Sequence, residues 1–213
     1  MHAVVFAYHD VGVNCLKALL TAGIQIDLVV THQDDPNENV WFGSVAKLCE
    51  DQKIPYITPN ANQLMGLVPQ IQQLSPDYLF SFYYRHMIPA ELLACAKIAA
   101  LNMHGSLLPK YRGRAPVNWA ILHGETETGA TLHIMEVKPD AGDIVGQSAV
   151  SIGPNETATD VFGKVSQAAI TVMNQVLPEL AQGHIPRKPN NLAQGSYFGG
   201  RKPADGQILW HQT

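Results

Sequence analysis

The feature that most constrains the fold is the alternation of short apolar runs with helical patterns. Residues 3–8 (AVVFAY) are apolar without interruption, which is typical of a strand covered on both faces of a parallel sheet. A polar loop follows, and then Leu16, Leu19 and Leu20 recur at helical spacing. The chain therefore opens as a β-loop-α unit.

The same alternation continues to the middle of the chain. Apolar runs predict further strands at residues 26–31, 55–59, 78–84 and 99–104, and the segments 42–52 and 62–74 predict helices between them. An acidic turn at 33–38 separates the second strand from the first of these helices. We therefore expect an α/β fold with a Rossmann-like, mostly parallel sheet flanked by helices.

The second half of the chain differs in character. Residues 106–116 (SLLPKYRGRAP) predict an irregular loop before a short helix at 117–123. Two strands are expected at 129–137 and 144–152, and a long helix at 158–182, with Gly183 as its stop. After Ile185 the residues predict a linker-like tail without a recognisable element, so we expect a catalytic domain at 1–189 and a tail at 190–213.

Composition excludes several classes of protein. Charged residues make up 15% and hydrophobic residues 46% of the 213 residues, which favours a folded α/β enzyme over a disordered chain. The net charge of -4 provides no general attraction for nucleic acid. Three cysteines without a CxxC predict neither disulfides nor a metal site and fit a reducing cytoplasm. No signal peptide or membrane-length apolar run is recognised, so membrane insertion is not expected.

Asn102 and His104 are the first candidates for chemistry. They lie two residues apart at the end of a predicted strand, so both side chains point to the same face. Strand ends of this kind bind ligands in open α/β sheets, and an amide donor beside an imidazole forms a plausible catalytic pair. The alternative is a hydrogen-bonded polar pair without a catalytic role.

A carboxylate in the turn after the next strand is the third candidate. Asp140 could approach His104, stabilise its protonated form and raise its pKa. The competing interpretation makes Asp140 a turn residue, and Asp143 could take either role on composition alone. The residues by themselves leave these alternatives open.

Two other groups of residues could bind ligands. Lys110, Arg112 and Arg114 form a basic cluster suited to an anion, although a solvated loop face explains them equally. Met87 and Ile88 follow two tyrosines and could line a pocket for a flat heterocycle, but burial in the core is the more common role of such residues. The loop HDVGVN after the first strand lacks GxGxxG, which argues against a nicotinamide cofactor.

The segments 80–88 (FSFYYRHMI), 101–147 and 197–203 (YFGGRKP) together resemble the folate-dependent formyltransferase family. The joined motif runs from Asn102-x-His104-x-Ser106 through LLP and Arg112-Gly113 to Asp140-x-Gly142. Within the family the chain is most similar to the branch that formylates UDP-4-amino-4-deoxy-L-arabinose in polymyxin resistance. Relatives also carry a small β-rich region after this point, so the tail is expected to begin a further C-terminal region.

The resemblance implies roles for the three candidates. An amine attacks the formyl carbon of 10-formyltetrahydrofolate, Asn102 stabilises the oxyanion that develops, and His104 manages the protons. It also implies that Asp140, rather than Asp143, holds His104 and raises its pKa. The donor pocket implied by the family comprises His86, Met87, Ile88, Arg114, Glu136, Val137, Lys138, Pro139 and Asp140.

The amine acceptor expected from the same resemblance is a nucleotide-linked amino sugar. The candidate contacts for this acceptor are Tyr8, His9, Asp10, Tyr197, Phe198 and Arg201. Two positions depart from the close relatives: GGRKP lacks a second arginine that is common there, and Pro139 replaces a small residue.

Three alternatives remain at this point. A formyl-folate hydrolase would use a similar set of residues with water as the acceptor, and only the acceptor pocket would distinguish it. Methionyl-tRNA formyltransferase shares the chemistry, but the acidic segment 33–38 would repel tRNA phosphates. A non-catalytic ligand-binding module with the same fold is the alternative from another class. Neither the exact acceptor nor the oligomeric state follows from the residues.

Overall fold

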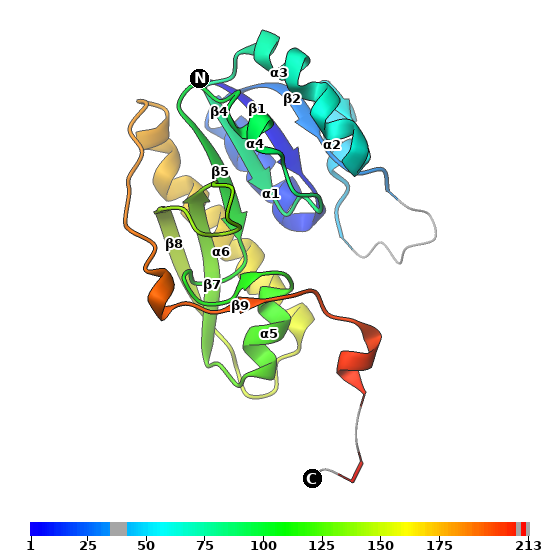
Figure 1. The fold of residues 1–213 in the computed structure, drawn as a ribbon, viewed down its shortest axis with the longest axis vertical. Helices are drawn as coiled ribbons and strands as arrows, with labels where there is room; N and C mark the ends of the chain where they lie inside the picture. Colours follow the sequence, from blue (N-terminus) through cyan, green and yellow to red (C-terminus); the bar gives the residue numbers. More distant parts are fainter. Residues whose placement is uncertain (35–41, 208–209, 212–213) are drawn as a thin grey trace.

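A seven-stranded sheet forms the centre of the protein. The computed structural model describes residues 1–34, 42–207 and 210–211. The strands lie in the order β3-β2-β1-β4-β5-β7-β8 (Figure 1). Their bounds are β1 His2–Ala7, β2 Gln25–Val30, β3 Tyr56–Ile57, β4 Tyr78–Phe82, β5 Ala99–His104, β7 Glu127–Ile134 and β8 Ile144–Ser151. The five strands from β3 to β5 are parallel, and β7 and β8 continue the sheet antiparallel. The predicted mostly parallel α/β sheet is confirmed.

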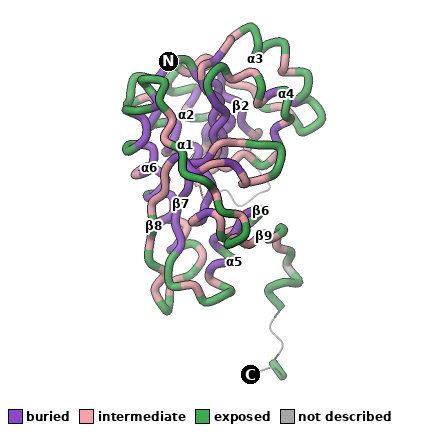
Figure 2. Tube along the Cα trace, turned by 60° about the vertical axis from the view of Figure 1, so that its left-hand side comes forward, coloured by how far each residue is buried: buried purple, intermediate pink, exposed green. Residues whose placement is uncertain are grey.

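Helices cover both faces of this sheet, which explains why residues 3–7 of β1 are all apolar and buried. The helices are α1 His9–Thr21, α2 Val45–Gln52, α3 Val68–Leu74, α4 Ala90–Leu93, α5 Pro116–Leu122 and α6 Ala158–Leu180. Ala3 and Val5 of β1 belong to the core on the side of α1 and α6, whereas Val4 and Phe6 belong to the core on the side of α3 and α4. Alternate side chains of one strand thus enter different cores. Buried residues accordingly run along the middle of the molecule in Figure 2.

Several helix and strand bounds differ from those predicted. Helix α2 begins at Val45 because Ser44 caps it, its side chain accepting a hydrogen bond from the Lys47 amide at 3.1 Å. The expected helix at 62–74 is divided into a 3-10 helix, η1 Ala61–Leu67, and α3, where Pro69 occupies the first turn. Strand β7 ends at Ile134, three residues early, and an exposed loop follows. Most of the predicted acidic turn at 33–38 lies outside the described residues.

The expectation of a tail without recognisable elements was wrong. The tail contains η2 Leu192–Gln194, β9 Tyr197–Phe198 and η3 Pro203–Gly206. Strand β9 pairs in parallel with β6 Arg112–Gly113, and the Phe198 ring stacks on Tyr111 and Trp119 with centroids 5.3 and 5.0 Å away. A two-residue strand shows no periodicity, so only its distant partner reveals it. The division at residue 189 remains a prediction.

The strand order identifies the edge of the sheet where a ligand site is expected. Strand β1 leads through α1 to β2 on one side, while β4 lies on its other side, so the order reverses between β1 and β4. Crevices beside such a reversal, at the carboxyl ends of the strands, are the usual ligand sites of open α/β sheets. Strand β5, which carries Asn102 and His104, pairs with β4, so its carboxyl end lies beside this point of reversal. Among the described residues, no helix is long and apolar enough to cross a membrane.

Candidate active site

Asp140, the third candidate, lies beside His104 and is connected to Asn102 through a further histidine, His133. His104 Nδ1 lies 3.6 Å from Asp140 Oδ1. Asn102 Nδ2 lies 3.1 Å from His133 Nε2, and the same His133 nitrogen is 3.4 Å from Asp140 Oδ1. The structure therefore brings the three predicted residues together and adds a fourth, His133.

His104 is enclosed, with 6% of its surface exposed. Its Nε2 lies 2.8 Å from the Tyr111 carbonyl oxygen, and because a carbonyl only accepts, Nε2 carries the hydrogen. Burial lowers the pKa of His104 below its ordinary value, although the Asp140 carboxylate and the hydrogen bond to Tyr111 act in the opposite direction. The predicted net rise in this pKa was wrong, because desolvation outweighs the attraction of Asp140. At neutral pH the imidazole is uncharged and Nδ1 is free to take a proton.

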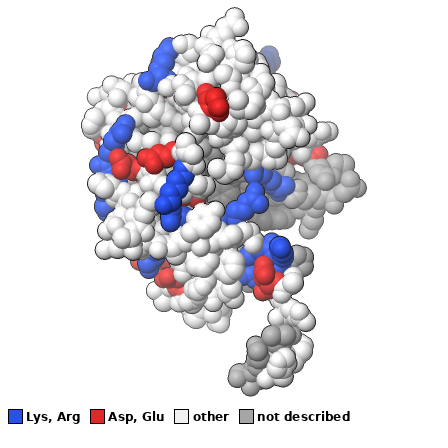
Figure 3. All heavy atoms as spheres, viewed as in Figure 1, with Lys and Arg blue, Asp and Glu red and all other residues white. Residues whose placement is uncertain are grey.

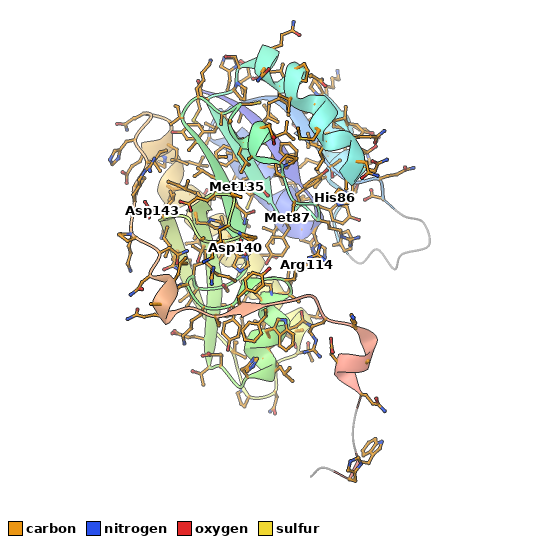
Figure 4. The ribbon with its side chains drawn as sticks, in the orientation of Figure 1. His86, Met87, Arg114, Met135, Asp140 and Asp143 are labelled. Atoms are coloured by element: carbon orange, nitrogen blue, oxygen red, sulfur yellow. The ribbon has the colours of Figure 1, made fainter. Side chains whose placement is uncertain are left out.

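Asp140 is ionised despite its burial. Burial by itself raises the pKa of Asp140, but His104, His133 and the Gly113 amide together hold it well below its ordinary value. The Gly113 N–H donates to Asp140 Oδ2 at 2.8 Å. Asp140 adopts a left-handed backbone with φ of 50°, which aspartate tolerates better than most residues. Asp143 lies apart from this group, and its carbonyl accepts the Ile134 amide at 2.9 Å (Figure 4).

His133 is the residue that sequence reasoning missed. It lies on β7 directly opposite Asn102 of β5, and it is 2% exposed. Its Nδ1 lies 2.8 Å from the Ile134 carbonyl, so Nδ1–H is the donor and Nε2 can accept from the Asn102 amide. His133 therefore fixes the orientation of Asn102. In the sequence, the only hint of this role is that His133 lies on a predicted strand seven residues before Asp140. Histidines are common on strands, so this position alone did not mark it as a site residue.

The residues expected at the donor pocket come from three segments: the loop after β4, the turn between β6 and α5, and the loop after β7 that carries Asp140 itself. Met87 is 67% and Val137 80% exposed, whereas Ile88 is buried in the core beside α4, which supports the core interpretation for Ile88 alone. Figure 4 shows His86, Met87 and Arg114 on the same side of Asp140. Arg114 is exposed and its Nη2 donates to the Arg85 carbonyl at 3.4 Å. The remaining loop residues Glu136, Lys138 and Pro139 are exposed or half-buried.

The acceptor candidates near the N-terminus are engaged in packing. Tyr8 is 2% exposed, with its ring edge-on to His32. The His9 ring stacks on Phe42 at 3.9 Å, and Asp10 Oδ1 accepts the Gly43 amide at 2.7 Å. These contacts hold the chain around residue 43 close to the start of α1.

The acceptor candidates of the tail differ in accessibility. Phe198 is enclosed by protein rings, whereas Tyr197 is 58% exposed. The Arg201 guanidinium lies 5.1 Å from the centroid of the Trp119 ring, and its Nη2 donates to the Asp205 carbonyl at 3.0 Å. Of these three, Tyr197 offers the open ring face that stacking requires.

The expected basic cluster is divided by the structure. Lys110 Nζ lies 3.6 Å from Glu125 Oε1. Arg112 is 9% exposed, with its guanidinium 5.8 Å from the centroid of the Tyr197 ring. Arg114 instead reaches the loop after β4, where it contacts the Arg85 carbonyl next to His86 and Met87. Figure 3 shows Lys and Arg side chains next to a hollow in the middle of the visible face, and acidic side chains scattered around it.

The fold and this group of residues are typical of an α/β transferase. An amide donor, an uncharged imidazole and an ionised carboxylate meet at the carboxyl edge of the sheet, where they can stabilise a developing negative charge and accept a proton. Residues 2–177 match the formyl transferase family, and the chain belongs to this family.

Solved structures share the fold over most of the chain. An N-formyltransferase from Helicobacter canadensis in complex with folinic acid and dTDP-3-aminofucose is 23% identical, with a TM-score of 0.75 over 93% of this chain and 70% of that one. A glycinamide ribonucleotide transformylase from Symbiobacterium toebii is 17% identical, with a TM-score of 0.77 over 89% of this chain and 92% of that one. A 4-N formyltransferase from Francisella tularensis is 22% identical, with a TM-score of 0.72 over 93% and 76%.

Proposed function

We propose that this formyltransferase moves a formyl group from 10-formyltetrahydrofolate to the primary amine of a nucleotide-linked amino sugar, in particular UDP-4-amino-4-deoxy-L-arabinose. The observation that carries the proposal is the connected group of Asn102, His133, Asp140 and His104 in a chain of the formyl transferase family. The proposed role in polymyxin resistance rests on the resemblance to the branch of the family that formylates this UDP-linked sugar.

The residues around Asp140 fit a flat folate ring. Met87 is exposed on the loop after β4, and Val137 is exposed on the loop that carries Asp140, so they offer apolar surface for the faces of a heterocycle. Backbone groups of 136–140 offer hydrogen bonds to its polar edge, and Arg114 offers a positive charge for a carboxylate. When bound, the folate supplies the formyl carbon that the amine attacks.

Asn102 and His104 have separate tasks in this reaction. The Asn102 amide, oriented by His133, donates a hydrogen bond to the formyl oxygen as that oxygen becomes negative. His104 Nδ1 accepts the proton that the attacking amine releases, and Asp140 Oδ1 at 3.6 Å stabilises the resulting imidazolium. His104 then returns this proton to the folate nitrogen as the bond from that nitrogen to the formyl carbon breaks, so that tetrahydrofolate leaves. Burial lowers the pKa of His104, so the imidazole is uncharged before the reaction and ready to accept that proton.

The support for a sugar nucleotide as acceptor is of two kinds. The Helicobacter canadensis neighbour binds dTDP-3-aminofucose, and the Francisella tularensis neighbour is a 4-N formyltransferase. In this chain Tyr197 exposes its ring beside the buried Arg112, a combination suited to stacking a base and attracting a phosphate. Transfer to tRNA is less favoured because the net charge is -4 and the segment 33–38 is acidic.

The test supplies 10-formyltetrahydrofolate with one amine at a time and measures release of tetrahydrofolate. The amines are UDP-4-amino-4-deoxy-L-arabinose, dTDP-3-aminofucose, glycinamide ribonucleotide and charged initiator methionyl-tRNA. We expect turnover with the UDP-sugar, at least about tenfold above the other amines. Turnover restricted to tRNA or to the ribonucleotide would replace the proposed acceptor, and absence of transfer to all four would favour a non-catalytic module.

A further inference from the structure

A segment outside the matched family region contacts both sides of the catalytic group. This segment comprises residues 188–198, whereas the family match ends at residue 177. It begins by pairing with the start of β8, where Lys188 and Ile144 exchange two backbone hydrogen bonds of 2.9 and 2.8 Å. It ends in β9, beside the loop that carries Tyr111 and Gly113. Between these ends it passes the turn that carries Asp140.

Asn190 holds the turn that carries the catalytic carboxylate. Its Nδ2 donates to the Asp140 carbonyl at 3.1 Å and to the Gly142 carbonyl at 3.2 Å. This matters because Asp140 has a positive φ of 50°, a backbone conformation that costs energy in any residue other than glycine. One amide that binds the carbonyls on both sides of Ala141 keeps the chain in this conformation.

Ser196 and β9 hold the partners of His104 and Asp140. Ser196 Oγ accepts the Tyr111 amide at 2.8 Å, and the Tyr111 carbonyl accepts His104 Nε2–H at 2.8 Å. The carbonyls of Ser196 and Phe198 accept the amides of Arg112 and Arg114, each at 3.0 Å. These bonds flank Gly113, whose own amide donates to Asp140 Oδ2. The second half of the segment therefore fixes one hydrogen-bond partner of His104 and one of Asp140.

We propose that the 188–198 segment positions His104 and Asp140. Asn190 is the positioning residue for Asp140, and Ser196 positions Tyr111, whose carbonyl holds His104. The proposal rests on the function proposed above, because it assigns to Asp140 and His104 the roles given there. It also means that the catalytic unit extends past residue 189, so loss of the Asn190 or Ser196 contacts alters the distance between the Asp140 carboxylate and the His104 imidazole.

Three substitutions of Asn190 separate positioning from packing. Asn190→Asp keeps the shape but turns an oxygen toward two carbonyls, Asn190→Ala removes the amide, and Asn190→Gln retains a donor. Asn191→Ala is the matched control, because Asn191 caps η2 within the same segment by accepting the Ala193 amide at 3.3 Å. Each variant is assayed for kcat, KM and thermal unfolding, and His104 is followed by NMR titration of its ring protons.

We expect kcat to fall at least about tenfold in Asn190→Asp and Asn190→Ala, as loss of a buried hydrogen-bond donor predicts. The pKa of His104 should fall further in both, because Asp140 is the carboxylate that opposes the effect of burial, while His133 adds to that effect. Asn190→Gln should recover most of the activity, and Asn191→Ala should match the wild type. Ser196→Ala should lower kcat without lowering the affinity for the amine.

A drop in thermal stability with unchanged kcat and unchanged His104 titration would reduce the segment to a packing role and overturn the proposal. Should Asn190→Asp fail to fold, Asn190→Ala and Ser196→Ala provide the same comparison. The titration needs no substrate, so it tests positioning even if wild-type protein transfers no formyl group. In that case the proposed function fails, while a shift of the His104 pKa would still show that Asn190 controls the geometry.

Discussion

Replacing Asp140 with asparagine tests the central pair most directly. The side chain keeps its size, and its oxygen can still accept the Gly113 amide, but the negative charge 3.6 Å from His104 Nδ1 disappears. Two unit charges at that distance attract each other by about 5 kcal/mol at an effective dielectric constant of 20. Relaxation of neighbouring groups recovers part of this energy, so we expect kcat to fall by about 10²–10³.

The assay is the pH dependence of formyl transfer in Asp140→Asn beside the control Asp143→Asn. Without the carboxylate, burial lowers the pKa of His104 further, so the acid limb of kcat should move to lower pH while the maximum rate falls. The control should keep both the wild-type rate and profile. An Asp140→Asn enzyme within tenfold of wild type, with an unmoved acid limb, would refute the coupling of Asp140 to His104.

Four other outcomes can be checked. Asp140 stabilises the folded protein above its ordinary pKa of 3.8, and this stability is lost as the pH falls below that value. In acid unfolding, the free energy of unfolding of Asp140→Asn should therefore decline less steeply with falling pH than that of the wild type. An equally steep decline would contradict this. His133→Phe leaves the Asn102 amide without its acceptor, so kcat should fall about tenfold or more and the free energy of unfolding by about 1–3 kcal/mol. A loss of stability with unchanged kcat would remove His133 from the site. Burial, and to a lesser extent His86 and Arg85, lowers the pKa of His32 to about 4. The free energy of unfolding should therefore decline as the pH falls from 6.5 toward 4, and it should decline less in His32→Phe. An NMR titration of His32 with a midpoint near 6.5 would contradict this. Gly113→Ala places a Cβ against the Phe198 carbonyl oxygen at a φ of 97°, so urea unfolding should show a loss of about 2–3 kcal/mol. Gly66→Ala, whose Cβ meets nothing within 4 Å, should show little loss.

The pattern of apolar runs was sufficient to predict the sheet because burial on both faces leaves a strong sequence signal. It predicted β1, β4 and β5 to within two residues, and it placed Asn102 and His104 on one strand end. The same pattern overextended β7 to residue 137, because Met135 and Val137 are apolar although the chain leaves the sheet after Ile134. Hydrophobicity alone does not distinguish a buried strand residue from an exposed loop residue such as Val137.

The order of residues was enough to predict the α/β class and the catalytic candidates Asn102 and His104. Resemblance to a family then favoured Asp140 over Asp143. The sequence could not reveal His133, because its role depends on the pairing of β5 with β7, which brings residues 102 and 133 opposite each other. Nor could it give the direction of the His104 pKa shift. That direction is the balance of desolvation against one carboxylate at 3.6 Å, and both quantities exist only after the chain has folded around the imidazole. The tail shows the same dependence: Asn190 and Ser196 are ordinary loop residues until tertiary structure places them against Asp140 and Tyr111.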